Sequence, residues 1–192
     1  MAQKTLIFIE SNYLYLLSKF FNTKIDLFKF SYNLAKNENM EIKTVYYYTS
    51  PPFQNNPPTL EESKRKSGYD SFINKIKKSN IIIREGRCQN IEGYREKGVD
   101  TLFTIDLMNI LINNLKEKDK ITKVILFTCD TDFVPVIERI KQEGIIVILY
   151  YYSDFKRKSK FSMSNHILNV CNKKVLITQN FLKKSEIIKS LF

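Results

Sequence analysis

Two aspartates separated by one residue, Asp130 and Asp132, have the types and spacing that suit metal chemistry. They follow the apolar run 124–126 and open a helical pattern, so they lie at the end of a predicted strand. Glu10 follows another apolar run, and Asp100 stands at a predicted helix start. In open α/β sheets, ligands bind beyond the carboxyl ends of the strands, where carboxylate oxygens suit a hard divalent cation.

Acids that converge on one cleft predict metal-dependent hydrolysis. Magnesium takes a few carboxylates and keeps several waters, so such a cleft can hold one or two ions. Two ions about 3.5–4 Å apart can activate water and steady the leaving oxygen in phosphodiester cleavage. The alternative is that Asp132 or Thr131 caps the following helix and that Asp100 caps a helix from Thr101. Acids at strand ends and at a helix start together favour the shared site.

Other familiar chemistries lack their residues. His166 is the only histidine, and no nucleophile-elbow motif accompanies it, which argues against a serine or cysteine hydrolase. Gly93 and Gly98 have the spacing of a phosphate loop, but Val99 and Asp100 follow where lysine and serine or threonine are required. Hydride transfer and P-loop hydrolysis are therefore disfavoured.

Length and composition predict one globular domain over residues 1–192, with 43% apolar and 13% aromatic residues. No apolar run reaches the roughly 18–20 residues that span a bilayer, and the N-terminus shows no signal-peptide pattern. Cys88, Cys129 and Cys171 lack zinc-site or disulfide spacing. We therefore expect a cytoplasmic protein with reduced thiols and no membrane partner.

The net charge of +11 comes from 31 Lys and Arg against 20 Asp and Glu. Because the predicted site is acidic, the positive charge must lie elsewhere, and it suits a polyanion such as nucleic acid. Lysines that only solvate the surface are the alternative. The basic clusters fall at residues 64–66, 75–78, 156–160, 173–174 and 183–184.

The elements that must position the acids alternate between strand and helix patterns. This alternation predicts an α/β protein with a three-layer α/β/α, Rossmann-like fold and a mainly parallel sheet of five or six strands. The predicted strands are 5–9, 41–48, 80–84, 124–128 and 145–151, with 175–178 as a short sixth. The predicted helices are 12–36 with a break near 22–23, 60–79, 101–117 and 133–143. Predicted loops are 50–58 and 153–160, and a C-terminal helical segment at about 162–191 packs on a motif-bearing core at about 5–150.

Helical periodicity predicts which residues of two helices are buried. In 101–117 the predicted core stripe is Ile105, Met108, Ile112 and Leu115. The inward positions after Asp132 are Phe133, Ile137 and Ile140, and Gly144 ends that helix. Asp106 lies six residues beyond Asp100, which turns it by about 240° from the same helix face. It is therefore the weaker candidate ligand.

Three motifs resemble those of the NYN-domain family, a branch of the PIN-like ribonucleases. The family's first strand ends in Asp-Gly-Ser-Asn followed by an apolar and an aromatic residue, and residues 8–15 (FIESNYLY) are similar. Its Lys-Gly-Val-Asp, with a second Asp six residues on, is matched by residues 97–100 and Asp106. Its Ser-Gly-Asp-x-Asp-Phe, with a Pro soon after, resembles residues 128–133 and Pro135. The order and spacing of the three motifs agree across the motif-bearing core.

The resemblance implies a PIN-like fold, a Mg²⁺ or Mn²⁺ site and endonuclease action on RNA. The residues that it implies as catalytic metal ligands are Glu10, Asp100, Asp130 and Asp132. Asn12 would steady the site or the substrate phosphate. The first motif departs from the family, because Glu10 replaces Asp and either one residue is missing or Tyr13 occupies the Asn position. The extra methylene of glutamate can move a ligand oxygen by about 1 Å.

Two functions follow from these residues. In the first, the chain is a metal-dependent endoribonuclease, and the side chains that guide RNA phosphates are Arg95, Lys97, Lys156, Arg157 and Lys158. In the second, it is a catalytically inactive relative that binds RNA or a protein as a regulator. Retention of Asp100, Asp130 and Asp132 favours the first function, whereas the altered first motif favours the second.

Single-stranded RNA is the expected partner in either case, and the pattern leaves a monomer and a homodimer both open. The tyrosines at 46–48 and 150–152 are expected to finish strands, with base stacking as the alternative. A toxin-like nuclease and a factor of a bacteriophage or mobile element both fit the residues.

Overall fold

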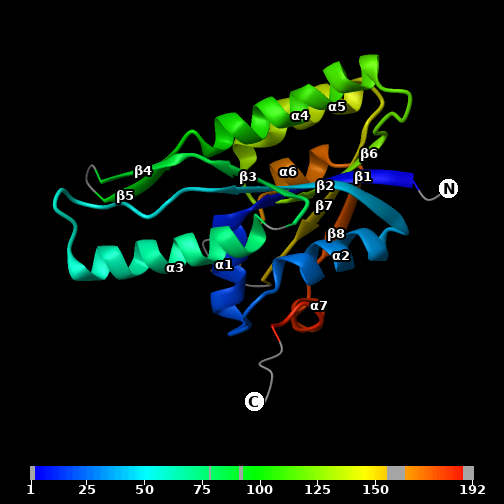
Figure 1. The fold of residues 1–192 in the computed structure, drawn as a ribbon. Helices are drawn as coiled ribbons and strands as arrows, with labels where there is room; N and C mark the ends of the chain where they lie inside the picture. Colours follow the sequence, from blue (N-terminus) through cyan, green and yellow to red (C-terminus); the bar gives the residue numbers. More distant parts are fainter. Residues whose placement is uncertain (1–2, 78, 91–92, 155–162, 188–192) are drawn as a thin grey trace.

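A six-stranded parallel sheet runs through the centre of the molecule (Figure 1). The computed structural model describes residues 3–77, 79–90, 93–154 and 163–187. The strand order is β3-β2-β1-β6-β7-β8, which confirms the predicted α/β fold with a parallel sheet. The strands are β1 (Gln3–Glu10), β2 (Met40–Thr49), β3 (Ile81–Glu85), β6 (Lys123–Phe127), β7 (Ile146–Tyr151) and β8 (Lys173–Leu176).

Helices cover both faces of this sheet and complete the three layers (Figure 1). One face carries α1 (Ser11–Phe20), α2 (Leu27–Asn37) and α3 (Leu60–Ile76). The other carries α4 (Val99–Lys116), α5 (Val134–Gln142) and α6 (Asn165–Val170). The short α7 (Gln179–Lys183) packs on α2, where the rings of Phe30 and Phe181 lie 6.1 Å apart. Within the described ranges, no helix is long and apolar enough to cross a lipid bilayer.

The strand order reverses between β1 and β6. From β1 the chain builds outward through β2 and β3, and from β6 it builds in the opposite direction through β7 and β8. Both central strands are buried on their two faces, as expected for the interior of a parallel sheet. Ile9 lies opposite Phe127 in the register of this pair, so the two strands end at the same level. A reversal of this kind opens a crevice at the carboxyl ends of the strands.

Helix α4 turns a different face to the core from the one that its periodicity predicted. Ile105, Ile112 and Leu115 are 46%, 50% and 86% exposed, and Met108 is only partly buried. The buried apolar residues are instead Val99, Phe103, Leu107 and Ile110. Apolar residues occur all round this helix, so their spacing alone does not identify the side that contacts the sheet.

The other predicted elements lie within a few residues of their expected bounds. The break near 22–23 separates α1 from α2, and Asn22 there has a φ of +48°. In α5 and the turn before it the buried residues include Phe133, Ile137 and Ile140, as predicted. Gly144 follows that helix with a φ of +82°. Most of the predicted loop 153–160 lies outside the described residues.

The sequence did not predict the antiparallel hairpin formed by β4 (Arg87–Asn90) and β5 (Tyr94–Lys97). Gly86 closes its base, because a Cβ there would lie 2.5 Å from the backbone oxygen of Lys97. The hairpin therefore sits directly against the start of α4. The C-terminal segment contributes β8 to the sheet beside β7, close to the short sixth strand predicted at 175–178, and α6 and α7 flank it.

A buried ion pair ties α4 to the sheet. Asp106 on α4 accepts hydrogen bonds from both Nε and Nη2 of Arg84 on β3, with Nε 2.6 Å from Oδ2. The hydroxyl of Tyr48 on β2 donates to the same Oδ2 at 3.0 Å. Asp106 is buried and Arg84 is partly exposed. This aspartate is thus satisfied by structural partners and faces away from Asp100.

We expect Asp106→Asn to lower the free energy of unfolding by about 2–3 kcal/mol, because Arg84 loses its charge partner in a largely buried setting. Urea denaturation at neutral pH measures the loss. Asp119→Asn is the matched control, since Asp119 pairs with Lys4 at the exposed surface and such pairs contribute less than about 1 kcal/mol. Equal losses in the two variants would contradict a special role for the buried pair.

Candidate active site

The adjacent ends of β1 and β6 bring Glu10 and Asp130 together through one hydroxyl. Thr128 is buried, and its Oγ1 donates a hydrogen bond to Oε2 of Glu10. The same Oγ1 accepts a hydrogen bond from the backbone N of Asp130 at 3.1 Å. Because Thr128 contacts both residues, it fixes their separation at the crevice where the strand order reverses.

The short helix η1 (Thr131–Phe133) holds Asp130 and Asp132. Asp130 is its N-cap, and its Oδ1 accepts a hydrogen bond from the backbone N of Asp132 at 2.9 Å. The predicted cap at Asp132 or Thr131 is therefore wrong by one or two residues. Capping occupies one carboxylate oxygen of Asp130, and a carboxylate has a second oxygen that can accept other partners.

Asp100 enters the site from the first turn of α4. The N-cap of this helix is Gly98, with a φ of +81°, and the helix begins at Val99. The alternative in which Asp100 caps a helix from Thr101 is therefore wrong. Glycine adopts this left-handed conformation at low cost, and it turns the chain from β5 into α4. A negative charge in the first turn is also favoured by the helix dipole.

The negative charges of these acids affect the pKa values of Glu10 and Asp100. Burial raises the pKa of Glu10 to about 7; the Thr128 hydrogen bond opposes this rise, and the charges of Asp130 and Asp100 add to it. Burial also raises the pKa of Asp100, with further contributions from Asp130 and Asp132. The four predicted acids are thus close enough for charges among them to raise the pKa of Glu10 and Asp100.

Glu96 on β5 is a fifth acid of this group, and the sequence analysis missed it. Its charge raises the pKa of both Glu10 and Asp100, and its Oε1 accepts a hydrogen bond from Ser50. The only signal in the sequence was a short polar segment between Gly93 and Gly98, which does not show that the segment folds back as a hairpin.

The donor set fits a hard divalent cation by its chemistry. Carboxyl groups with a raised pKa, such as those of Glu10 and Asp100, are stabilised in their charged form by a nearby positive charge. Mg²⁺ prefers oxygen ligands. Among the described residues, no three acidic, histidine or cysteine side chains stand at the spacing of a formed metal site. Magnesium is commonly held by one or two carboxylates with several waters, so a three-acid cage is not required.

The residues predicted to contact nucleic acid are only partly described. Asn12 is exposed in the first turn of α1, two residues after Glu10. Arg95 and Lys97 are exposed on β5. The remaining three, Lys156, Arg157 and Lys158, lie outside the described residues. The described members therefore lie on two elements, α1 and the hairpin.

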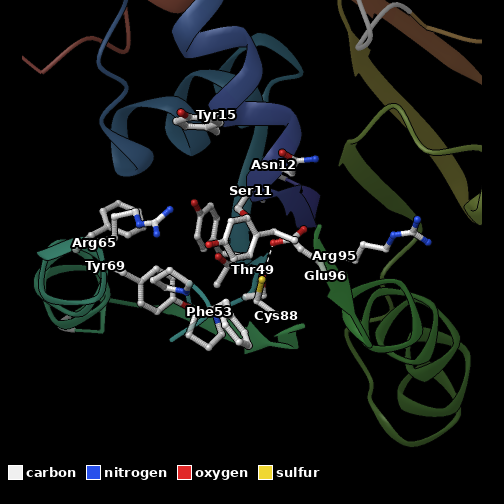
Figure 2. Close-up of a pocket in the computed structure, with 16 residues that line it drawn as sticks. Ser11, Asn12, Tyr15, Thr49, Phe53, Arg65, Tyr69, Cys88, Arg95 and Glu96 are labelled. Carbon is white, nitrogen blue, oxygen red and sulfur yellow. Dashed lines mark hydrogen bonds between the residues drawn. The ribbon is translucent and has the colours of Figure 1, made fainter. Parts of the chain in front are cut away.

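A pocket of about 790 Å³ adjoins the acids (Figure 2). It lies between the start of α1, the proline-containing loop after β2, helix α3 and the β4–β5 hairpin. Ser11 and Asn12 line it next to Glu10, and Glu96 lines it from the hairpin. Arg65 and Arg95 lie on opposite sides of the aromatic rings in Figure 2. The acids and the pocket are thus parts of one continuous surface.

Nucleophilic catalysis by sulfur or histidine finds no support at this edge. Burial raises the pKa of Cys129 to about 12, so its thiol stays protonated at neutral pH. His166 lies exposed on α6.

Comparison with known proteins agrees with this geometry. A family model described as NYN domain matches residues 4–176, which confirms the resemblance of the three motifs. A crystal structure of a protein of unknown function from Vibrio parahaemolyticus is similar to the chain, with a TM-score of 0.61 and 18% identity. The match covers 94% of this chain and 96% of that one, and it supports the fold alone. The search of curated proteins finds no match.

The raised pKa of Glu10 predicts how stability depends on pH. Its folded-state pKa of about 7 exceeds the ordinary value near 4.5, so folding favours the protonated form. Stability therefore falls as pH rises from about 4.5 through 7. We expect Glu10→Gln to be more stable than the wild type by about 2 kcal/mol at pH 8, and the difference to vanish below pH 4.5.

Urea denaturation in EDTA-containing buffers between pH 4.5 and 8 measures this difference. Glu138→Gln, at an exposed position on α5, is the control and should show no such pH dependence. If the free energies of unfolding of Glu10→Gln and the wild type differed by the same amount at every pH, the charged form of Glu10 would not be destabilised by its surroundings.

Proposed function

This chain belongs to the NYN domain family, and we propose on that premise that it is a metal-dependent endoribonuclease. The observation that carries the proposal is that Thr128 joins Glu10 to Asp130 at the reversal point of the sheet, where Asp130 and Asp100 also raise the pKa of Glu10. These acids come from β1, α4 and the turn after β6, so the fold rather than local sequence gathers them. The nuclease character of the family supports the same reaction class.

The residues proposed to hold Mg²⁺ or Mn²⁺ are Glu10, Asp100, Asp130 and Asp132. Such an ion, when bound, supplies Lewis acidity to the phosphate and lowers the pKa of a water. Thr128 orients the Glu10 carboxylate through its hydrogen bond to Oε2.

The proposed substrate is RNA, and its phosphates would be guided by basic side chains around the acids. Arg95 and Lys97 are exposed on β5 on either side of Glu96, and Asn12 is exposed in the first turn of α1. The cluster of Lys156, Arg157 and Lys158 is proposed to extend this surface. The net charge of +11 supports a polyanionic partner. We propose that the protein acts in the cytoplasm, where its three free cysteines stay reduced.

A second candidate is a catalytically inactive relative that binds RNA or a protein as a regulator, alone or as a homodimer. Two observations favour it. Glu10 stands where the family motif has Asp, and the described acids do not stand at the spacing of a formed metal site. The two candidates differ in the role of the acids. The nuclease requires them for cleavage, whereas in the inactive relative they only contribute to the local charge.

We expect the purified chain to cleave a labelled single-stranded RNA with Mn²⁺ or Mg²⁺ and to leave it intact in EDTA. The double variant Asp130→Asn, Asp132→Asn should reduce the cleavage rate by about a hundredfold or more, because it removes two carboxylate charges from the site. Gel analysis of cleavage over time measures this rate.

Asp119→Asn is the control for this experiment, since Asp119 pairs with Lys4 on β1 and lies apart from the acids. It should cleave at the wild-type rate. Intact RNA with every metal, together with a gel shift that shows binding, would favour the inactive regulator. Cleavage that persists in the double variant would assign the activity to a contaminant or to another site.

A further inference from the structure

The pocket beside the acids is walled by aromatic rings from several separate elements. They come from α1, β2, the loop after β2, α3 and β5, as Tyr15, Tyr47, Phe53, Tyr69, Phe72 and Tyr94. The rings of Phe53 and Tyr94 lie 5.9 Å apart, and those of Tyr47 and Phe72 lie 5.8 Å apart. A volume of about 790 Å³ is in the range of pockets that enclose small organic ligands.

Hydrogen bonds fix the walls of this pocket in place. Glu62 on α3 is buried and accepts hydrogen bonds from the backbone N of Thr59 and from Nδ2 of Asn55, both at 2.8 Å. It thereby ties the proline-containing loop to the start of α3. Tyr69 donates from its hydroxyl to Glu85 at 2.6 Å, and Ser50 donates to Glu96 across to the hairpin. Little ordering is therefore needed when a ligand enters.

The charge around the rings suits a nucleotide. The guanidinium of Arg65 lies over the ring of Tyr94, 5.7 Å from its centroid, and Arg95 lies on the other side of the pocket (Figure 2). Aromatic faces stack on bases of any sequence, while arginines pair with phosphate oxygens. A base between the rings with a phosphate near Arg65 would satisfy both features, and Arg95, whose guanidinium extends away from the rings in Figure 2, would meet the strand farther along.

We propose that this pocket binds an unpaired nucleobase of the RNA strand, adjacent to the phosphodiester that the acids would process. The proposal rests on the proposed ribonuclease function and names its substrate class as single-stranded RNA. A base that is paired and stacked within a duplex cannot enter a pocket walled by rings. Glu96 links the two parts, because it lines the pocket and acts on the charge of Glu10 and Asp100.

Binding of a fluorescent single-stranded RNA hexamer to the full chain in EDTA tests the pocket without cleavage. We expect Tyr94→Leu to weaken binding about tenfold, since stacking on one aromatic ring has an effect of that order. Tyr94→Phe should keep wild-type affinity. A hexamer of the same backbone with abasic sugars, and a duplex of the same length, should each bind at least about tenfold more weakly than the single strand.

Tyr32→Leu is the matched control. Tyr32 is 57% exposed against 56% for Tyr94, and it too has a cation over its ring, Lys36 at 5.5 Å, but it lies on α2. It should bind like the wild type. Equal affinity of Tyr94→Leu and the wild type, or equal affinity for the intact and abasic hexamers, would overturn the proposal.

Cleavage with Mn²⁺, followed in parallel, separates this proposal from the proposed nuclease activity. Base-dependent binding that Tyr94→Leu weakens, in a chain that cleaves nothing, would refute the nuclease and keep the pocket. Cleavage by a Tyr94→Leu variant with wild-type affinity would keep the nuclease and refute the pocket.

Discussion

The parallel pairing of β1 with β6 is the constraint on which the candidate site depends. Ile9 and Phe127 lie opposite each other, so Glu10 and Asp130 leave the sheet at the same level. Carboxylates at such a point repel one another, and nothing in their own segments favours the approach. The approach is maintained because both strands are buried in a close-packed core and cannot shift without losing contacts there. Packing thus holds like charges together, which is typical of functional sites.

Two aspartates of α4 have different surroundings and therefore different roles. Asp106 is buried and held by Arg84 and Tyr48, so its charge is compensated within the protein. Asp100 lies a turn and a half earlier, beyond the left-handed Gly98, and the charges near it are those of other acids. Asp106 anchors α4 to the sheet, and Asp100 faces the crevice. A compensated charge stabilises the fold, whereas an uncompensated one is available to a cation or a substrate.

The sequence was sufficient for the sheet because apolar runs mark buried strands, and it directed attention to Glu10 and Asp130 because they follow two of those runs. It could not identify the buried face of α4, where Ile105, Ile112 and Leu115 match the helical period as well as the true core residues do. It also missed the β4–β5 hairpin, whose eight residues include few apolar side chains. Closure of that hairpin at Gly86 against Lys97 depends on a contact eleven residues away, which no local pattern encodes. Glu96 was missed for the same reason.

An acidic edge repels the phosphates that a nuclease must approach, so charge alone cannot both gather a cation and hold the substrate. In the proposed function this conflict is resolved by separating the two tasks in space. Stacking on aromatic rings does not depend on the charge of the strand, and Arg65 lies over the ring of Tyr94 rather than among the acids. Glu96 belongs to both regions. A cation bound at the acids would make the negative potential weaker there and at the pocket, so metal and RNA binding would favour each other.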